Sequence, residues 1–422
     1  MSKKYLYGTS ALVAAGLSAG GAQAADPVEL NLSGNMQYWF GYTTGGVDGN
    51  GLKQNEWGHT TNNEVHFRGA TTLDNGIRFA VRIELEGEVS GDTIDQQFMT
   101  ISGGFGQIEI GSINTAAYRM SNWTASPGIG INSGWLSAIV PGWGGFRRPL
   151  GTTHLDIGND DFVISYFTPR FAGFQVGASF QPDSGAGAAG TGSDTAAAGS
   201  ESTAFHNGVT VGVNYVENWG GLDVAIAGGY YRQDQPENID AADFTYGLET
   251  DEVEGFSVTT NFGFGGFILG GGYAELWEGR VTGASACTSS GTSPFAPTTN
   301  GTIVCQGGVA GDTTEGYSWD VDLSYGSGPW RAGVHFIHGE EEGNRDNPDN
   351  RTQDSFKVGF SYTLGPGIST DISYVYTHIG AEGSANANDQ TSGITTVGTP
   401  PANGAAFDSE AHAAVWGINV RF

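Results

Sequence analysis

Apolar and polar residues alternate with a period of two along most of the chain from Leu30 onward. In the first such segment one face carries apolar side chains, namely Leu32, Met36, Tyr38, Phe40 and Tyr42. The opposite face carries Asn31, Ser33, Asn35 and Gln37. Period two is the signature of a β-strand whose two faces meet different surroundings. The pattern therefore predicts an all-β protein in which each strand separates an apolar environment from a polar one.

A hairpin over residues 64–86 shows the pattern most clearly, because alternating runs flank the turn sequence Asp74-Asn75-Gly76. A three-residue loop with glycine at the left-handed position pairs Leu73 with Ile77. In this register three polar pairs face each other: Glu64 with Glu86, His66 with Glu84, and Arg68 with Arg82, while Arg78 lies nearer the turn. Like charges directly opposite each other destabilise a sheet. The arginine pair therefore indicates a functional position.

Further alternating segments bring the prediction to about sixteen strands, joined in alternation by turns of about three to five residues and loops of about seven to fifty. Short turns at one end and long loops at the other are typical of a transmembrane antiparallel β-barrel. An even strand number closes such a sheet without an edge, as lipid requires. Aromatic residues near strand ends fit interfacial girdles: Tyr42, Phe162, Tyr325, Trp330 and Phe422. Sixteen strands leave an interior too wide for side chains to fill, so we expect a channel.

The longest connection, residues 112–161, has little strand periodicity and is far longer than ordinary connections. It carries large rings and guanidinium groups: Tyr118, Arg119, Trp123, Trp135, Trp143, Phe146, Arg147 and Arg148. Such side chains are costly to leave on a loose surface loop, so we expect the segment to fold into the lumen and narrow it. Its rings either anchor the loop to the wall, the interpretation we favour, or form a path for sugars.

The composition agrees with strands and excludes some classes of protein. The 422 residues include 70 glycines, which disfavour helices, and outside the N-terminus no apolar run approaches the ~20 residues of a membrane helix. The 45 acidic residues outnumber the 17 basic ones. Nucleic-acid binding needs basic patches that neutralise phosphates, so no nucleic-acid partner is expected.

The N-terminus is typical of a secretory signal. Lys3 and Lys4 precede an apolar run, and Ala22-Gln23-Ala24 forms a small-residue cleavage site. We therefore expect a signal peptide over residues 1–24 and a mature barrel over residues 25–422; a short membrane anchor is the weaker alternative. Cys287 and Cys305 are the only cysteines. Export favours a disulfide between them, with two free thiols or a metal-binding pair as alternatives.

At this point the chain resembles the trimeric general porins of Gram-negative outer membranes. The resemblance is sharpest over Glu64 to Leu85, Gln97 to Gly111, Tyr166 to Phe180, and the last strand ending in Phe422. It implies location in the outer membrane, a homotrimer with one pore per subunit, and a constriction formed by the third long loop, residues 112–161. A terminal phenylalanine implies recognition by the outer-membrane assembly machinery.

In the general porins that the chain resembles, acidic residues on the third loop usually face arginines on the barrel wall. Arg68, Arg82 and, lower down, Arg78 would supply the wall. The loop departs from the pattern, since its acids lie near its end at positions 156, 160 and 161. Its basic residues are Arg119, Arg147 and Arg148. The sequence therefore leaves open which face carries which charge.

The function expected is a passive diffusion channel for small hydrophilic solutes and ions, with no cofactor. A substrate-specific sugar or anion channel would share the same fold. An outer-membrane enzyme is one alternative class, but the sequence shows no catalytic constellation at an interpretable spacing. Glu84 and Glu86 could form a catalytic carboxylate pair, but a water-filled lumen would not desolvate them as acid–base catalysis requires. An adhesin or structural protein is the other alternative class. The acidic loops either bind divalent cations that bridge lipopolysaccharide or are simply solvated.

The wall charges have two interpretations. Arg68 and Arg82 either orient permeating solutes, which we favour, or form salt bridges with Glu64, Glu84 and Glu86. No metal site is expected, because His335 and His338 fall on opposite faces of one strand.

Overall fold

The computed structural model describes most of the chain. The described residues are 27–45, 55–87, 93–132, 136, 139–140, 151–155, 160–183, 206–234, 252–282, 295–297, 303–305, 312–341, 350–381 and 407–422. The predicted signal peptide, residues 1–24, lies outside them, so that prediction and the start of the mature chain stay predictions.

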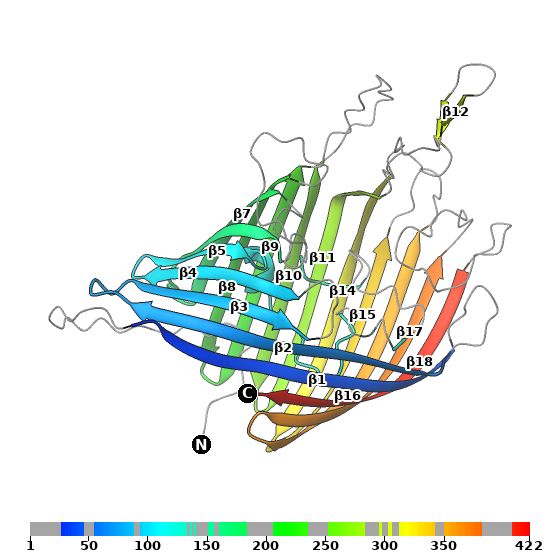
Figure 1. Cartoon of the computed structure of the whole chain (residues 1–422). Coiled ribbons are helices and arrows are strands. Elements are labelled where there is room, and N and C mark those ends of the chain that lie inside the picture. The colour runs from blue at the N-terminus through cyan, green and yellow to red at the C-terminus, as the bar shows by residue number, and fades with distance from the viewer. Residues whose placement is uncertain are drawn as a thin grey trace.

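Sixteen antiparallel strands close into one barrel, which confirms the predicted fold (Figure 1). The barrel strands are β1 (Glu29–Gly45), β2 (Trp57–Thr72), β3 (Arg78–Glu86), β4 (Ile94–Gly103), β5 (Gly106–Ser112), β6 (Phe162–Phe167), β7 (Phe174–Asp183), β8 (His206–Trp219), β9 (Leu222–Asp234), β10 (Val253–Phe264), β11 (Phe267–Thr282), β14 (Asp312–Ser327), β15 (Trp330–Glu341), β16 (Arg351–Gly365), β17 (Ile368–Ala381) and β18 (Phe407–Arg421). Each strand pairs with its neighbours in sequence order, and β1 pairs with β18 to complete the ring.

Three short elements lie outside the wall. The strands β12 (Phe295–Pro297) and β13 (Ile303–Cys305) form a separate two-stranded sheet within the connection from β11 to β14. The helix α1 (Ala116–Met120) lies in the predicted third loop. No helix in the described part of the chain is long and apolar enough to span a membrane.

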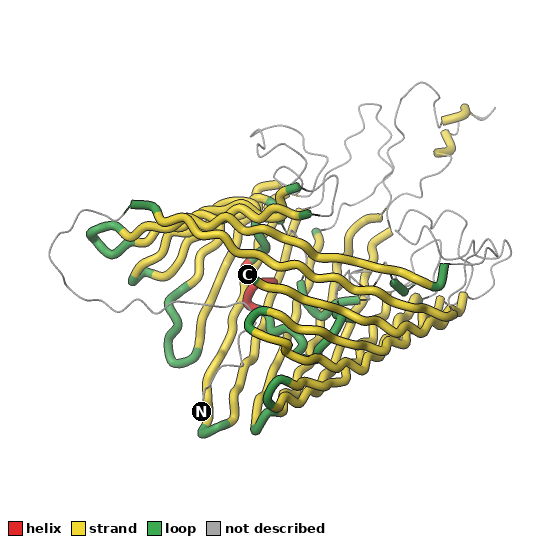
Figure 2. The backbone as a smooth tube through the Cα atoms, turned by 60° about the horizontal axis from the view of Figure 1, so that its bottom comes forward, coloured by secondary structure: helices red, strands yellow, loops and turns green. Residues whose placement is uncertain are grey.

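Connections alternate between short and long around the ring. The short ones run from the two residues 104–105 to the six residues 168–173, a slightly wider range than predicted. They are the tight turns drawn at one end of the strands in Figure 2. The long ones run from residues 87–93 to residues 113–161. We call the two ends of the barrel the turn end and the loop end.

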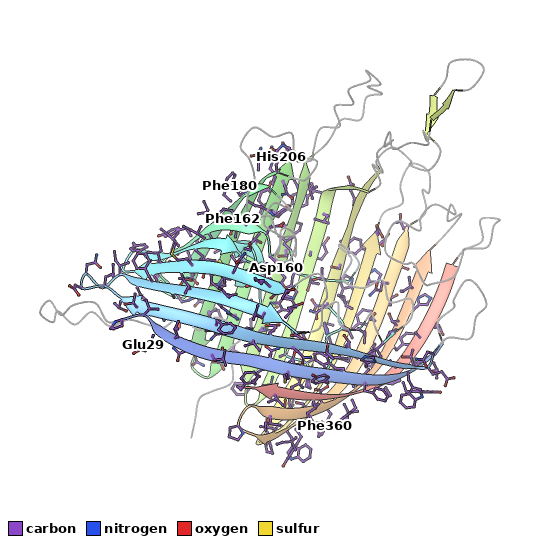
Figure 3. The ribbon with its side chains drawn as sticks, in the orientation of Figure 1. Glu29, Asp160, Phe162, Phe180, His206 and Phe360 are labelled. Carbon is purple, nitrogen blue, oxygen red and sulfur yellow. The ribbon has the colours of Figure 1, made fainter. Side chains whose placement is uncertain are left out.

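The wall is polar inside and apolar outside. On β8, Val211 and Val213 are 42% and 43% exposed, whereas Thr210 and Asn214, which flank them, are 2% and 6% exposed. Phe180 and Phe360 likewise lie on the outer surface (Figure 3). An apolar outer band with a polar interior is the arrangement that lipid demands of a barrel.

The last residue takes part in closing the ring. The backbone N–H of Gly34 donates to the Phe422 carbonyl at 2.8 Å, and the Phe422 N–H donates to the Gly34 carbonyl at 3.1 Å. The Phe422 ring is 55% exposed on the outer surface. The C-terminus therefore sits at the seam between the first and last strands.

Candidate functional site: the inserted loop and the charged wall

The third loop, residues 112–161, runs along the inner face of the barrel. Its helix α1 is seated against strands β7, β8 and β9, where small residues leave room for it. The backbone N–H of Ala116 donates to Ser179 Oγ at 2.7 Å. At Gly212 an added Cβ would lie only 3.1 Å from the Ala116 carbonyl oxygen. Because the glycine lies on the polar face of its strand, the helix is inside the lumen.

After the helix the loop crosses β10 and β14. The backbone N–H of Asn122 donates to Thr259 Oγ1 at 2.7 Å, and Asn261 Nδ2 donates to the Trp123 carbonyl at 2.9 Å. The backbone N–H of Ala125 then donates to Asp322 Oδ2 at 3.1 Å. These bonds attach the loop first to β10 and then to β14, which lies beyond β11 in the ring.

The segment from Ser126 to Gly128 lies flat on β15, β16 and β17. Lys357, fully buried on β16, donates to the Ser126 carbonyl at 3.3 Å. A Cβ at Gly359 would overlap the Pro127 carbonyl, and Gly128 itself has φ +86, which favours glycine. The close approach of two backbones therefore depends on glycine on both sides.

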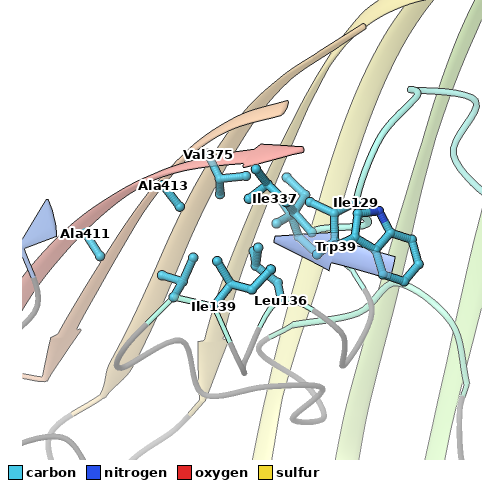
Figure 4. Packing of buried hydrophobic residues seen from close by; sticks show 11 residues of the cluster. Trp39, Ile129, Leu136, Ile139, Ile337, Val375, Ala411 and Ala413 are labelled. Carbon is cyan, nitrogen blue, oxygen red and sulfur yellow. The ribbon is translucent and has the colours of Figure 1, made fainter. Parts of the chain in front are cut away.

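An apolar cluster holds the next part of the loop against β1, β15, β17 and β18. Ile129, Ile131, Leu136, Ile139 and Val140 of the loop pack with Trp39, Ile337, Val375, Ala411, Ala413 and Val415 of the wall. Figure 4 shows Leu136 and Ile139 beside these strands. Thr43 Oγ1 also donates to the Ile139 carbonyl at 2.6 Å. The loop thus buries an apolar side against the otherwise polar interior.

The returning part of the loop is held by β14 and then by the strands near its start. Thr153 Oγ1 donates to Asp320 Oδ1 at 2.8 Å, and His335 Nε2 lies 2.8 Å from the other Asp320 oxygen. Near the end, Gln181 Nε2 donates to Asp161 at 2.6 Å and Gln96 Nε2 donates to Asp160 at 2.8 Å. The loop therefore begins and ends on β4–β7 after crossing most of the ring.

The aromatic residues of the loop pack on one another. The rings of Trp123 and His154 stack with centroids 3.8 Å apart, and Tyr118 meets Trp123 edge to face at 5.3 Å. The imidazole of His154 donates from Nδ1 to Ser121 Oγ at 2.9 Å, because that hydroxyl already donates to the Tyr118 carbonyl. These contacts favour the anchoring role for Tyr118 and Trp123 over a sugar path. Trp135 and Trp143 lie outside the described residues.

Burial controls the protonation of His154. The side chain is 2% exposed, and no described residue offers a hydrogen-bond partner to its Nε2 atom. Burial lowers the pKa of the imidazole to about 4. A second ring proton would be buried without a hydrogen-bond partner among the described residues, so the neutral form is the one that fits the loop.

The charged residues predicted on the wall lie together on β2 and β3. The register is the predicted one, with Glu64 opposite Glu86, His66 opposite Glu84 and Arg68 opposite Arg82. Arg68 and Arg78 are exposed and Arg82 is half-buried. None of the loop contacts described above falls on β2 or β3. The contacts given above for the described residues of the loop therefore lie on other strands than these two.

His66 links the acidic and basic groups of this sector. Arg68 and Arg82 each place a guanidinium nitrogen near His66 Nδ1, at 3.3 and 3.2 Å. Since guanidinium groups only donate, Nδ1 accepts, and Nε2 donates to Glu64 at 2.6 Å. Arg82 also forms an ion pair with Glu84, which is 3% exposed. The salt-bridge interpretation of Arg82 is thus correct in part, while Arg68 keeps an exposed guanidinium.

Asp95 belongs to the same sector but was not singled out from the sequence. One oxygen each of Glu64, Glu86 and Asp95 lie within 4.8 Å of one another, and Glu64, His66 and Glu84 form a second such group. Asp95 follows an irregularity in the pairing of β3 with β4, between Ile83 and Leu85. The irregularity interrupts the period of two there. Asp95 is recognised as part of this sector only in the structure, where its carboxylate lies beside those of Glu64 and Glu86.

Among the arginines predicted on the loop, Arg119 can be placed. It forms an ion pair with Glu109 of β5, which is 2% exposed, and its guanidinium lies 5.2 Å from the centre of the Phe167 ring. The charge of Arg119 is therefore compensated at the wall. Arg147, Arg148, Cys287 and the side chain of Cys305 lie outside the described residues. His335 is buried on the inner face and His338 is part-exposed on the outer face, as predicted.

Comparison with family models gives a match to the Gram-negative porin model over residues 8–381. The chain belongs to the Gram-negative porin family. No curated protein sequence matches the chain. This porin is therefore placed by its family model and by its fold.

Solved structures of similar fold cover nearly the whole porin chain. A loop-deletion mutant of OmpT from Vibrio cholerae has a TM-score of 0.56 at 11% identity, covering 94% of this chain and 100% of that one. OmpF of Salmonella typhi has a TM-score of 0.56 at 14% identity, with 93% and 97% covered. The channel DcaP of Acinetobacter baumannii has a TM-score of 0.53 at 12% identity, with 94% and 98% covered. At these identities the likeness concerns the fold.

Family and fold together make this porin a channel of the Gram-negative outer membrane rather than an enzyme. The apolar exterior and polar interior of the barrel agree with that location.

Proposed function

We propose that this porin is a passive diffusion channel for small hydrophilic solutes and ions. The observation that carries the proposal is the course of the described part of the third loop: the contacts given for it lie on β1, β4, β5, β7–β10 and β14–β18, and the exposed Arg68 and Arg78 of β2 and β3 face the lumen. Solutes would pass between the loop and these two strands. Such a passage requires no conformational change and no energy source, because solutes move down their own concentration gradients.

The charged sector of β2 and β3 would set the ion selectivity. Fixed charges beside a narrow water-filled passage attract ions of opposite sign and repel those of like sign. Arg68 has an exposed guanidinium, whereas Arg82 shares its charge with Glu84. Arg68 therefore contributes more to anion attraction than Arg82.

The test is single-channel recording in a planar bilayer under a salt gradient, with the double variant Arg68→Ala and Arg82→Ala. The reversal potential is expected to move toward cation selectivity. Arg232→Ala is the matched control, because Arg232 is exposed on the outer face of β9 and pairs there with Glu252. No conductance in wild type would reject the channel, and an unchanged reversal potential in the double variant would reject the wall assignment.

We also infer a homotrimer with one pore in each subunit. A structure of similar fold, OmpT of Vibrio cholerae, is described as a trimer form. Chemical cross-linking and mass measurement in detergent test the inference: three copies are expected, and a monomer at all concentrations would reject it.

The outer surface supports a further proposal about lipid. Tyrosine hydroxyls near the loop end donate to carboxylates: Tyr42 to Glu56, Tyr230 to Glu254, Tyr273 to Glu275, Tyr317 to Glu340 and Tyr376 to Glu410. Tyrosine is favoured at membrane interfaces, so these pairs would lie at the headgroup level. Divalent cations would bridge the carboxylates to lipopolysaccharide phosphates. Loss of copurifying lipopolysaccharide on chelation, restored by magnesium, is the expected result.

The exposed ring of Phe422 at the barrel seam fits a signal for the outer-membrane assembly machinery. Deletion of Phe422 is expected to lower the amount of folded protein in the outer membrane, while refolding of the purified chain in detergent changes less. Equal loss in both settings would point to a role in stability alone.

A further inference from the structure

Two side-chain oxygens converge on the inner wall where the third loop crosses from β10 to β14. Asn261 of β10, Gly270 of β11 and Asp322 of β14 lie directly opposite one another in the strand pairing. An added Cβ at Gly270 would overlap both Asp322 Oδ1 and Asn261 Oδ1. The two side chains can approach each other in this way because the residue between them has no side chain of its own. Their Oδ1 atoms therefore lie beside a single point of the wall.

The other atoms of these two side chains hold the loop and fix the orientation of both groups. Asn261 Nδ2 donates to the Trp123 carbonyl at 2.9 Å, so it is the amide oxygen that faces Asp322. Asp322 Oδ2 accepts from the backbone N–H of Ala125 at 3.1 Å. The contacts that attach the loop therefore turn two hydrogen-bond acceptors toward each other.

The Oδ1 atom of Asp322 is buried and lacks a hydrogen-bond donor among the described residues. The side chain as a whole is 1% exposed. Thr124 and the electrostatic attraction of His335 and Lys357 stabilise the carboxylate, but none of these residues donates to Oδ1. A buried carboxylate oxygen that faces an amide oxygen is unfavourable unless a positive charge lies between them. The arrangement therefore points to a cationic ligand.

The buried charges around this position also include more carboxylates than cations. On the described parts of β14–β17 the buried carboxylates are Asp320, Asp322 and Asp371, and the buried lysine is Lys357. His335 lies 2.8 Å from Asp320 and is the buried histidine of these strands. With a neutral His335, three carboxylates face one ammonium group. A single divalent cation would balance the remaining charge, which is costly to bury alone.

We propose that a calcium ion binds between Asp322 and Asn261 and fastens the third loop to the wall. Both ligand atoms are oxygens, which hard cations prefer. Calcium–oxygen bonds are ~2.3–2.6 Å long, so two oxygens up to about 5 Å apart can share one ion. Calcium accepts an irregular shell completed by water, whereas magnesium demands a nearly octahedral one. Asn261 is part-exposed, so water can reach the ion from that side.

The ion would act on the attachment of the loop. It would hold two side chains whose remaining atoms bind the backbone at Trp123 and Ala125, so its release would loosen both contacts. Because the protein supplies only two ligand atoms, we expect a weak site with a dissociation constant of about 10⁻⁴–10⁻³ M. The inference concerns binding alone and goes beyond the proposed function, since it holds whichever solutes pass through the barrel.

The first experiment measures how calcium changes the stability of the full-length protein. Metal is removed with EDTA, the EDTA is removed in turn, and the protein is unfolded in urea and detergent with and without calcium. At a calcium concentration ten times the dissociation constant, the ratio of folded to unfolded wild type is expected to rise about elevenfold. Asn261→Leu should lose this rise. Asn261→Asp adds a second carboxylate and should reach the same rise at a lower calcium concentration.

The matched control is Asn214→Leu. Asn214 also donates from Nδ2 to a loop carbonyl, that of Met120 at 3.3 Å, but it does so from β8. Both leucine variants lose a hydrogen bond to the loop, so both should be less stable than wild type without calcium. Only Asn261→Leu should also lose the response to calcium, which separates an ion ligand from a residue that merely holds the loop.

Terbium luminescence locates the ion without reference to stability. Terbium occupies calcium sites and emits light when a nearby indole is excited. Trp123→Phe should lower the emission that calcium displaces, because the backbone of Trp123 contacts Asn261. Trp330→Phe should leave it unchanged, because Trp330 packs on Phe360 and Tyr362 at the outer surface.

Three results would each overturn the inference: no effect of calcium on wild type, an equal effect on wild type and Asn261→Leu, or equal terbium emission from wild type and Trp123→Phe. An equal effect on wild type and Asn261→Leu would place the ion on other carboxylates and leave Asp322 to be neutralised by a proton. If Asn261→Leu yields no folded barrel, the terbium comparison decides, since Trp123→Phe keeps an aromatic ring and the backbone carbonyl.

Discussion

The Lys357 ammonium group donates a hydrogen bond to the Ser126 carbonyl oxygen, 3.3 Å away, from the barrel wall to the inserted loop. Lys357 is fully buried, and Asp322 and Asp371 attract it electrostatically. A buried cation needs such partners, because desolvation would otherwise outweigh its contacts. The lysine therefore joins the loop and two neighbouring wall carboxylates in one charge-compensated contact.

Replacement of Lys357 by Met is expected to destabilise the barrel and loosen the loop. The substitution leaves Asp322 and Asp371 buried without their cation, and removal of one partner from a buried ion pair costs about 3–5 kcal/mol. Urea unfolding in detergent measures the loss, and protease cleavage within the loop measures the loosening. Arg331→Met is the control, because Arg331 is a part-exposed cation nearer the turn end of the adjacent strand β15. Equal unfolding midpoints for Lys357→Met and wild type would contradict the prediction.

Gly359→Ala is expected to push the loop away from the wall, into the lumen, and to lower the single-channel conductance. The added Cβ would overlap the Pro127 carbonyl, and both sides of that contact are backbone. Overpacking of this kind costs about 1–3 kcal/mol. At Gly365 an added Cβ meets nothing within 4 Å. Gly365→Ala should therefore leave both stability and conductance unchanged, and a similar effect of the two substitutions would show that crowding at Pro127 is not the cause.

Much of the barrel could be predicted because lipid on one side and water on the other impose a period of two. The hairpin of β2 and β3 is the best example, since its short turn also fixes the register. The same reasoning missed residues 57–63 at the start of β2. Thr60, Thr61, Asn62 and Asn63 place polar residues on both faces there, so the alternation disappears although the strand continues. The β12–β13 hairpin, which lies outside the barrel, also gave no such signal.

The wall charges were predictable from register, whereas the loop contacts were not. Arg68 and Arg82 face each other because one turn sets their pairing. Lys357 and Ser126 are separated by 231 positions. No local period connects them, and their contact follows from the path of the loop across the lumen. Asp95 lies close to the predicted wall charges, but the shift in register between β3 and β4 interrupts the alternation there, so the sequence does not show which face of the strand it lies on.

The attachment of the loop is expected to weaken as the pH falls, through His154. Burial lowers the pKa of this imidazole to about 4, whereas an unfolded histidine titrates near ~6.5. The unfolded chain therefore takes up the proton first. The stability supplied by the neutral ring is complete above about pH 6.5 and is lost between about pH 6.5 and pH 4, to a total of about 3 kcal/mol.

His154→Phe tests this dependence, because phenylalanine keeps a flat ring against Trp123 and does not titrate. The unfolding free energies of the variant and of wild type are compared at pH 7 and pH 4. The variant should lose less stability over this interval. Asp320 and His335 lie nearby in both proteins, so the difference between the two isolates His154. Parallel pH profiles would contradict the assignment.

Arg119 is expected to matter for stability and little for ion selectivity, in contrast to Arg68. Its guanidinium is paired with Glu109, which is 2% exposed and also accepts from Gln107 at 2.7 Å. Arg119→Met leaves that carboxylate buried without its cation, at a cost of about 3–5 kcal/mol. Arg119→Met combined with Glu109→Gln removes both charges and should recover part of the stability. The reversal potential of this double variant should stay close to that of wild type, because the net charge is unchanged. A shift as large as that of Arg68→Ala with Arg82→Ala would show that Arg119 acts on permeating ions despite its partner.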